Sequence, residues 1–451
     1  MDDAGVLGKM LFPVRRTSVL TQGLLVLGDQ SFRSASTFLS ALLVGRACGQ
    51  VEYGFYTLLL TLLVTAEAFQ AALVSTPYVV GNPSKAGPDK AVHLGNAALI
   101  QLLVAAGTTI LLLGLLYAFP PSETGGLSPW IVPAFALAYF ATLSREFFRQ
   151  VLLADLEVGW NLAFGAAVHG CVIAVLLGLY LTGRLNAGTA FVALAGCSLV
   201  PTALVRWFKR RRMRLEVEVL ASQFREYWHV GRWLFAQSAL VVVSGPVYTW
   251  VLASAHGQAA VGLLGACLLP SSVMSPLVQA LHALLLPKAS HAAQRGVGHV
   301  RRIVLASSVA VGLTFLAFPL VLGWFATPIM NLLFAGKYSP SGWLVGLLAL
   351  RTYLVVTVVP LTVGLVVCKQ AYTVFKSELV SLVLTALVGL PLTWVLGVWG
   401  VAWGFLLTRL CSRLYLALAF RRHVRSTGGA GPGAVPVDMS SGLAVAPAAV
   451  S

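Results

Sequence analysis

Charged side chains interrupt an apolar segment near the start of the chain. Residues 27–37, LGDQSFRSAST, put Asp29 and Arg33 between two runs typical of membrane-spanning helix. The i, i+4 spacing places both on one helical face, where they can form an ion pair. A charge at the bilayer centre costs about 2.5–3.5 kcal/mol on insertion scales, so both are expected to face protein or water. Gln22 and Ser36 extend the same face, which favours the wall of a hydrated cavity over an isolated packed pair.

Other apolar segments have polar faces as well. Glu67 lies in the apolar segment 53–80. Gln237 and Tyr248 align in the segment 231–254, and Gln279 lies in the segment 259–286. A two-fold relation between the halves of the chain would bring these four segments around one lumen. Arg351 lies deep in the apolar segment 341–367, about ten residues from its outer end. It is a further candidate for the wall of that lumen.

The composition indicates a polytopic membrane protein. Of 451 residues, 58% are hydrophobic and only 10% are charged, whereas about a quarter of residues are charged in soluble domains. Apolar runs long enough to cross about 30 Å of hydrocarbon recur throughout. We expect an all-α fold of about twelve transmembrane helices, at residues 19–45, 53–80, 92–118, 129–152, 159–182, 187–208, 231–254, 259–286, 303–324, 341–367, 373–396 and 399–420.

The net charge of +16 is explained by membrane topology, and no nucleic-acid partner is expected. With the N-terminus in the cytoplasm, most Lys and Arg residues fall in inward loops or at inward helix ends, as the positive-inside rule requires. Only Arg46, Arg184 and Lys337 fall outward. Both termini are therefore predicted to be cytoplasmic, and the basic run 206–214 is expected to touch anionic headgroups.

An internal repeat predicts two parallel six-helix bundles around a central cavity. GQVEYG at 49–54 and GQAAVG at 257–262 each follow the first span of a half. Parallel repeats with a site between them are a recurring transporter plan. The expected organisation is an N-terminal bundle (1–208), a basic linker (209–230), a C-terminal bundle (231–425) and a disordered tail (426–451).

The sequence predicts no enzyme, no cofactor and no metal site. The six cysteines are scattered without C-x-x-C spacing. The P-loop, zinc-protease and nucleophile-elbow motifs do not occur. The outward segments are short, which disfavours a membrane enzyme of glycan assembly.

The chain resembles the polysaccharide flippases of the multidrug/oligosaccharidyl-lipid/polysaccharide exporter superfamily. LLVGRACGQVEYGFYTLLLTL (42–62) resembles their turn between the first two spans, with Gly49, Tyr53, Gly54 and Tyr56 at familiar places. MNLLFAGKYSPSGWLVGLLAL (330–350) resembles their Leu-Phe-Gly-x-x-Tyr element. In that stretch Ala335 intervenes and only Lys337 separates Gly336 from Tyr338, so the second match is loose.

The resemblance implies alternating access and transfer of undecaprenyl-pyrophosphate-linked oligosaccharide to the outer leaflet of the bacterial cytoplasmic membrane. Arginine suits pyrophosphate because its planar fork donates bidentately. Asp29 and Glu67 are candidates for coupling protons or cations. The residues expected to bind the substrate are Arg33, Asp29, Gln22, Arg351, Gln237, Tyr248 and Gln279.

Alternative functions stay open at this point. The first is a cation-coupled exporter of small drugs or metabolites, and the second is a membrane-embedded enzyme of glycan assembly. The expected partners are the lipid-linked oligosaccharide, membrane lipids and a polysaccharide polymerase with its export machinery. The products would be O-antigen (lipopolysaccharide), capsule or exopolysaccharide, and the sequence does not say which.

Overall fold

A computed structural model describes residues 19–118, 130–210, 213–338, 342–368 and 370–427. Within these ranges all regular structure is helical. The chain divides into two compact units, residues 1–239 and 240–451. The expected disordered tail lies outside the described residues, apart from its first two positions.

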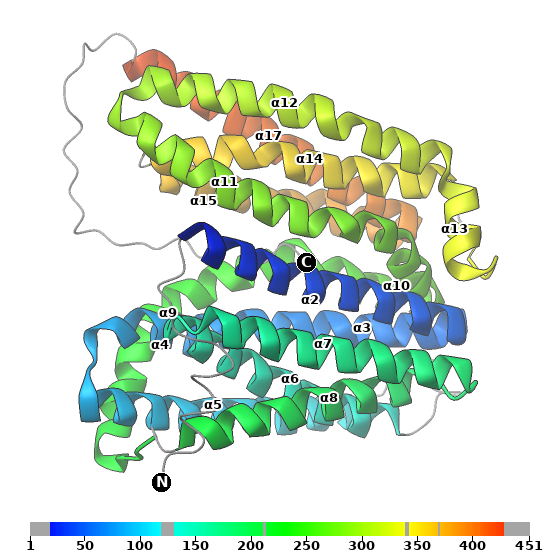
Figure 1. Cartoon of the computed structure of the whole chain (residues 1–451). Coiled ribbons are helices and arrows are strands. Elements are labelled where there is room, and N and C mark those ends of the chain that lie inside the picture. The colour runs from blue at the N-terminus through cyan, green and yellow to red at the C-terminus, as the bar shows by residue number, and fades with distance from the viewer. Residues whose placement is uncertain (1–18, 119–129, 211–212, 339–341, 369, 428–451) are drawn as a thin grey trace. The chain divides into compact units, whose positions relative to one another are not determined.

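The described part of the first unit contains seven α-helices in chain order and most of an eighth (Figure 1). In this unit α6 packs against α8 and α5, and α2 packs against α7. The elements are α2 (Val19–Ala47), α3 (Gln50–Gln70), α4 (Thr76–Gly81), α5 (Gly87–Ala118), α6 (Ile131–Ala154), α7 (Val158–Leu181), α8 (Ala187–Lys209) and α9 (Val217–Ser244).

The second unit repeats this packing. Here α14 packs against α17 and α12, as α6 does against α8 and α5, and α10 packs against α16. The recurrence of the same pairings in the same chain order agrees with the predicted internal repeat. The elements are α10 (Pro246–Leu268), α11 (Ser275–Gln294), α12 (Val297–Trp324), α13 (Ala326–Phe334), α14 (Gly342–Val367), α15 (Ala371–Leu384), α16 (Leu390–Leu396) and α17 (Val398–Thr427).

Ten helical segments of the described chain are long and apolar enough to cross a membrane. One of them, Pro246–Gln294, contains α10 and α11. Gly257, with φ 76° and ψ 178°, divides α10 itself into two helices at the turn expected from GQAAVG. The expected span 19–45 falls on α2. The expected span 231–254 falls on the end of α9 and the start of α10, which Gly245 separates.

The predicted linker 209–230 is partly helical. Its residues from Val217 onward form the first half of α9. Tyr227 is 1% exposed and packs in a hydrophobic cluster with residues of α4, α5 and α6. This part of the linker is therefore built into the core of the first unit.

The stretch that resembles the Leu-Phe-Gly-x-x-Tyr element ends a helix. Ala335 (φ 51°) and Gly336 (φ 78°) are left-handed and stop α13. Phe334 and Tyr338, on either side, are both fully buried, with ring centroids 5.0 Å apart. This motif therefore supports a tight turn.

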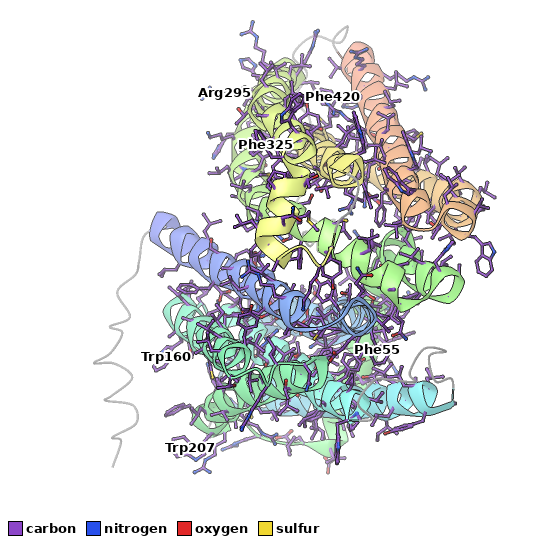
Figure 2. The ribbon with its side chains drawn as sticks, turned by 90° about the vertical axis from the view of Figure 1, so that its right-hand side faces the viewer. Phe55, Trp160, Trp207, Arg295, Phe325 and Phe420 are labelled. Carbon is purple, nitrogen blue, oxygen red and sulfur yellow. The ribbon has the colours of Figure 1, made fainter. Side chains whose placement is uncertain are left out.

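Large apolar side chains cover much of the outside of each unit. Trp160 and Trp207, labelled in Figure 2, are 37% and 50% exposed. Many leucines and valines on α5, α12 and α17 are exposed as well. A surface of this kind is stable in lipid, and with the ten apolar segments of the described chain it defines a multi-pass membrane protein.

Candidate functional site

The first unit contains a network of buried charges on three of its helices. Arg33 Nη2 lies 3.1 Å from Glu67 Oε2, and Arg33 Nη1 lies 3.4 Å from Glu146 Oε2. Arg149 Nη2 lies 2.6 Å from Glu146 Oε1. Arg145 Nη2 lies 3.5 Å from Glu67 Oε1. These contacts link α2, α3 and α6, and we call the group the N-unit ion network: Asp29, Arg33, Glu67, Arg145, Glu146 and Arg149.

Asp29 joins this network through α6. Its Oδ2 lies 3.5 Å from Nη1 of Arg149, and the residue is 4% exposed. The ion pairs of Arg33 go to Glu67 and Glu146, so the i, i+4 pair expected between Asp29 and Arg33 is absent from the ion pairs of these described residues. Carboxylates and guanidinium groups on neighbouring helices are the partners instead.

The network is electrically balanced. Three arginines face three carboxylates, and each ion has at least one partner of opposite charge. Balance is needed because an unpaired ion costs several kcal/mol when it is buried. The Arg33 side chain is the more accessible member of its pair with Glu146, at 30% exposed against 7%.

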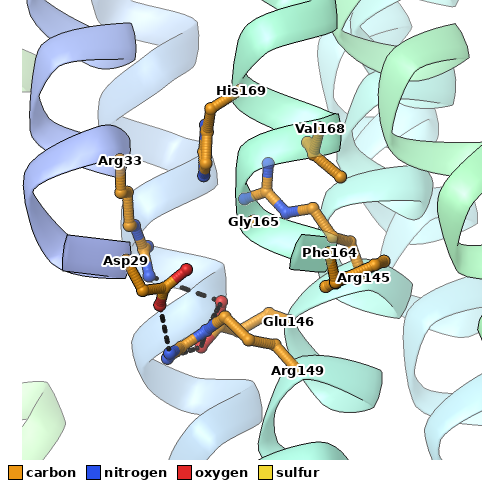
Figure 3. A pocket seen from close by; sticks show the side chains of 9 residues that line it. All are labelled: Asp29, Arg33, Arg145, Glu146, Arg149, Phe164, Gly165, Val168 and His169. Carbon is orange, nitrogen blue, oxygen red and sulfur yellow. Dashed lines mark hydrogen bonds and ion pairs between the residues drawn. The ribbon is translucent and has the colours of Figure 1, made fainter. Parts of the chain in front are cut away.

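A small cavity opens beside the network. Figure 3 shows it between α2, α6 and α7, with Phe164, Val168 and His169 completing the wall. Its volume of about 10 Å³ is close to the least that one water molecule requires. The cavity as it stands can hydrate the charges, but it is too small for an oligosaccharide.

Close contact between α2 and α7 depends on a glycine. A Cβ added to Gly165 would collide with the carboxylate Oδ1 of Asp29. The missing side chain lets Asp29 lie between α7 and Arg149. Gly170, one and a half turns further along α7, has open space where a Cβ would be added.

The other predicted substrate residues are spread over the fold. Gln22 lies on α2, with its side chain outside the described part of the chain. Gln237 is exposed on α9, and Gln279 is half-buried on α11. Tyr248 and Arg351 lie together in the second unit. The predicted ion-coupling pair, Asp29 and Glu67, belongs to the N-unit ion network.

In the second unit Arg351 stacks on an aromatic ring. Its Cζ lies 4.9 Å from the centroid of Phe405 on α17, which in turn lies 4.5 Å from the centroid of Tyr248 on α10. The Arg351 Nε is buried and has no hydrogen-bond partner in the described structure. Arg409 lies one turn beyond Phe405, on the same side of α17 as that ring.

Sequence reasoning assigned some of these charged positions to other roles or passed over them. The residues expected from the sequence to line the lumen do not include Arg145, Glu146, Arg149 or Arg409. The sequence had a usable signal, because three ionisable residues lie within five positions of α6, the least apolar of the ten candidate spans. A span with charges has to be buried in protein, and most of α6 is.

A second charged cluster lies at the ends of three spans of the first unit. Asp155, between α6 and α7, accepts from Lys209 Nζ at 2.7 Å and pairs with Lys90 Nζ at 2.8 Å. Lys209 also donates to Glu157 at 2.9 Å. Burial opposes ionisation of Asp155, but the bonds from Lys209 and Lys90 outweigh it and lower its pKa below the usual value. This cluster ties together α5, the turn after α6 and the end of α8.

The fold is shared with solved membrane transporters. A multidrug resistance MATE family transporter of the MOP superfamily, in an inward-facing conformation, matches with a TM-score of 0.69 and 13% identity over 88% of this chain and 95% of that one. The lipid II flippase MurJ, inward closed, matches with a TM-score of 0.67 and 12% identity over 87% and 86% of the two chains.

A third match has a lower score. The Vibrio cholerae MATE transporter VcmN, in a mutant form, matches with a TM-score of 0.54 and 15% identity over 90% and 96% of the chains. At these identities the likeness shows a common fold. No family model and no curated protein matches the sequence.

Proposed function

We propose that this protein is a flippase for undecaprenyl-pyrophosphate-linked oligosaccharide in the bacterial cytoplasmic membrane, working by alternating access. The observation that carries the proposal is the N-unit ion network, six ionisable side chains inside a bundle of membrane-spanning helices. Ionisable residues within the membrane are costly and mark substrate or ion pathways. The fold shared with a lipid II flippase and with multidrug transporters supports the transport of a substrate across the bilayer.

The chemistry of the network suits ion coupling better than substrate binding. Arg33, Arg145 and Arg149 are already neutralised by Glu67, Glu146 and Asp29, so an added anion would compete with those carboxylates. Protonation of one carboxylate would unbalance the network and release an arginine. We therefore assign Asp29 and Glu67 to coupling and Arg33 to holding Glu67 and Glu146.

Complementation tests the proposed function. In a strain lacking its own polysaccharide flippase, the wild-type chain should restore surface polysaccharide. Glu67→Gln should abolish restoration, because it leaves Arg33 and Arg145 without their shared partner. Glu218→Gln, at an exposed position on α9, is the matched control and should be fully active. Membrane levels of each variant are measured in parallel.

The same strains test the alternative function. The shared fold with multidrug transporters makes a cation-coupled exporter of small drugs the second candidate. Resistance to cationic drugs without restored polysaccharide would overturn the flippase proposal in favour of the exporter. Restored polysaccharide with unchanged drug susceptibility would support it.

A further inference from the structure

Two intramembrane arginines of the second unit have no carboxylate partner among the described residues. Arg351 and Arg409 make no ion pair in the described structure, and neither forms a hydrogen bond to an acidic side chain there. The whole second unit has only two acidic residues, Glu378 and Asp438. Asp438 lies outside the described residues, and Glu378, in the middle of α15, makes no ion pair among those described.

Both arginines lie deep within their helices. Arg351 is about 13 Å from the first residue of α14, and Arg409 is about 16 Å from the first residue of α17, at 1.5 Å per residue. The sequence places α14 and α17 among the membrane-spanning helices. Two cations held near each other in this environment are unfavourable unless an anion compensates them.

The two units differ in how the arginines on α6 and α14 are paired. In chain order α14 corresponds to α6, and both helices have a half-buried or buried arginine near the middle. On α6, Arg145 and Arg149 have Glu67, Glu146 and Asp29 as partners. On α14, Arg351 has the ring of Phe405 as its neighbour, and Arg409 lies one turn beyond that ring on α17.

We propose that Arg351, Arg409 and the Tyr248 hydroxyl form a binding site for a phosphate-type anion, the diphosphate group of the transported lipid. This inference rests on the proposed function for the source of the anion. Two guanidinium groups can bind a diphosphate by donating bidentate hydrogen bonds to its oxygens. The Arg351 guanidinium lies over the ring of Phe405, and Tyr248 packs against the same ring.

The surroundings of Tyr248 suit a fixed donor. The residue is fully buried, and its hydroxyl has no hydrogen-bond partner in the described structure. A Cβ at Gly389 or Gly404 would collide with the Tyr248 ring, so both glycines make room for it. The site therefore draws on α10, α14, α17 and the π-helical turn Thr385–Gly389, all within the second unit.

Binding of inorganic pyrophosphate to the full-length protein in phosphatidylcholine nanodiscs tests the site. Titration calorimetry should give a Kd for the wild type that weakens at least tenfold in Arg351→Gln and in Arg409→Gln. Arg351→Lys and Tyr248→Phe should weaken it a few-fold, and these variants keep the test meaningful if a glutamine variant does not fold. Arg421→Gln, exposed near the end of α17, should bind as the wild type does.

Two further arms identify the source of the anion. An isoprenoid diphosphate should compete with pyrophosphate, whereas phosphatidylglycerol in the nanodisc should not. Equal pyrophosphate affinity in the wild type, Arg351→Gln and Tyr248→Phe would overturn the site. Competition by phosphatidylglycerol but not by the isoprenoid diphosphate would overturn the assignment to the transported lipid.

Failure of this inference is distinguishable from failure of the proposed function. If the wild type restores polysaccharide and Arg351→Gln does so equally well with unchanged pyrophosphate affinity, the flippase stands and the site falls. If the wild type does not restore polysaccharide but pyrophosphate binding depends on Arg351, the site stands and the flippase proposal falls.

Discussion

At the scale of single residues, charge balance governs this protein. Arg33 and Glu67 lie 3.1 Å apart in a largely buried network, where a lone ion is far more costly than a missing pair. The effect of each side chain therefore depends on its partners. A single substitution leaves the N-unit ion network with a net charge, where the intact network has none.

The first prediction is a thermodynamic cycle on this pair. Arg33→Gln and Glu67→Gln should each lower the free energy of unfolding by about 2–4 kcal/mol, because each leaves an uncompensated ion. The double variant should lose less than the sum, with a coupling energy of about 1–3 kcal/mol. Thermal unfolding in detergent measures this, with Arg184→Gln, an exposed loop position, as the neutral control. Additive losses would show that the two charges act independently.

The second prediction concerns Asp155 and pH. Its pKa is lowered in the folded state, so its contribution to stability is present above the unfolded value of 3.8 and is lost as the pH falls through the lower folded pKa. Asp155→Asn should destabilise the protein by about 1–3 kcal/mol at pH 7. The difference in melting temperature between wild type and variant should shrink below about pH 4. A difference that stays constant down to about pH 3 would contradict the assignment.

At the scale of elements, the contact between α2 and α7 decides where Asp29 lies. Helices approach closely in membranes where small residues face each other, and Gly165 is such a residue. Its position opposite Asp29 couples helix packing to the ion network.

The third prediction follows from this contact. Gly165→Ala should lower the free energy of unfolding by about 1–3 kcal/mol, because the new methyl group has to displace the Asp29 carboxylate or part the helices. Transport should fall with it. Gly170→Ala on the same helix meets open space and should leave both melting temperature and transport unchanged. Equal behaviour of the two variants would exclude a special role for the contact.

At the scale of the whole molecule, the distribution of positive charge predicts the orientation in the membrane. Inward loops hold most of the lysines and arginines. The described loops are short, so their charges can set topology.

The fourth prediction is therefore a pattern of alkaline phosphatase fusions, which are active only outside the cytoplasm. Fusions after residues 184, 256 and 337 should be active, and fusions after residues 88, 218 and 296 inactive. An active fusion after residue 218 would put the start of α9 outside and would contradict the expected parallel arrangement of the two halves.

The sequence by itself determined the helical membrane fold and the existence of intramembrane charges. Long apolar runs have no other stable structure in lipid, and Asp29, Arg33 and Glu67 are identifiable because charges in such runs are rare. The internal repeat was also visible, through Gly49 and Gly257 at corresponding turns.

Only the tertiary structure decided which charges meet. Helical periodicity gives the face of a residue on its own helix, and so it suggested the local pair of Asp29 with Arg33. The partners of these residues come from α3 and α6, far away in the sequence. Ion pairing inside a bundle depends on which helices are neighbours and on their axial register. The ring of Phe405 beside Arg351 was likewise decided by packing, since spacing along one helix does not report what the next helix presents.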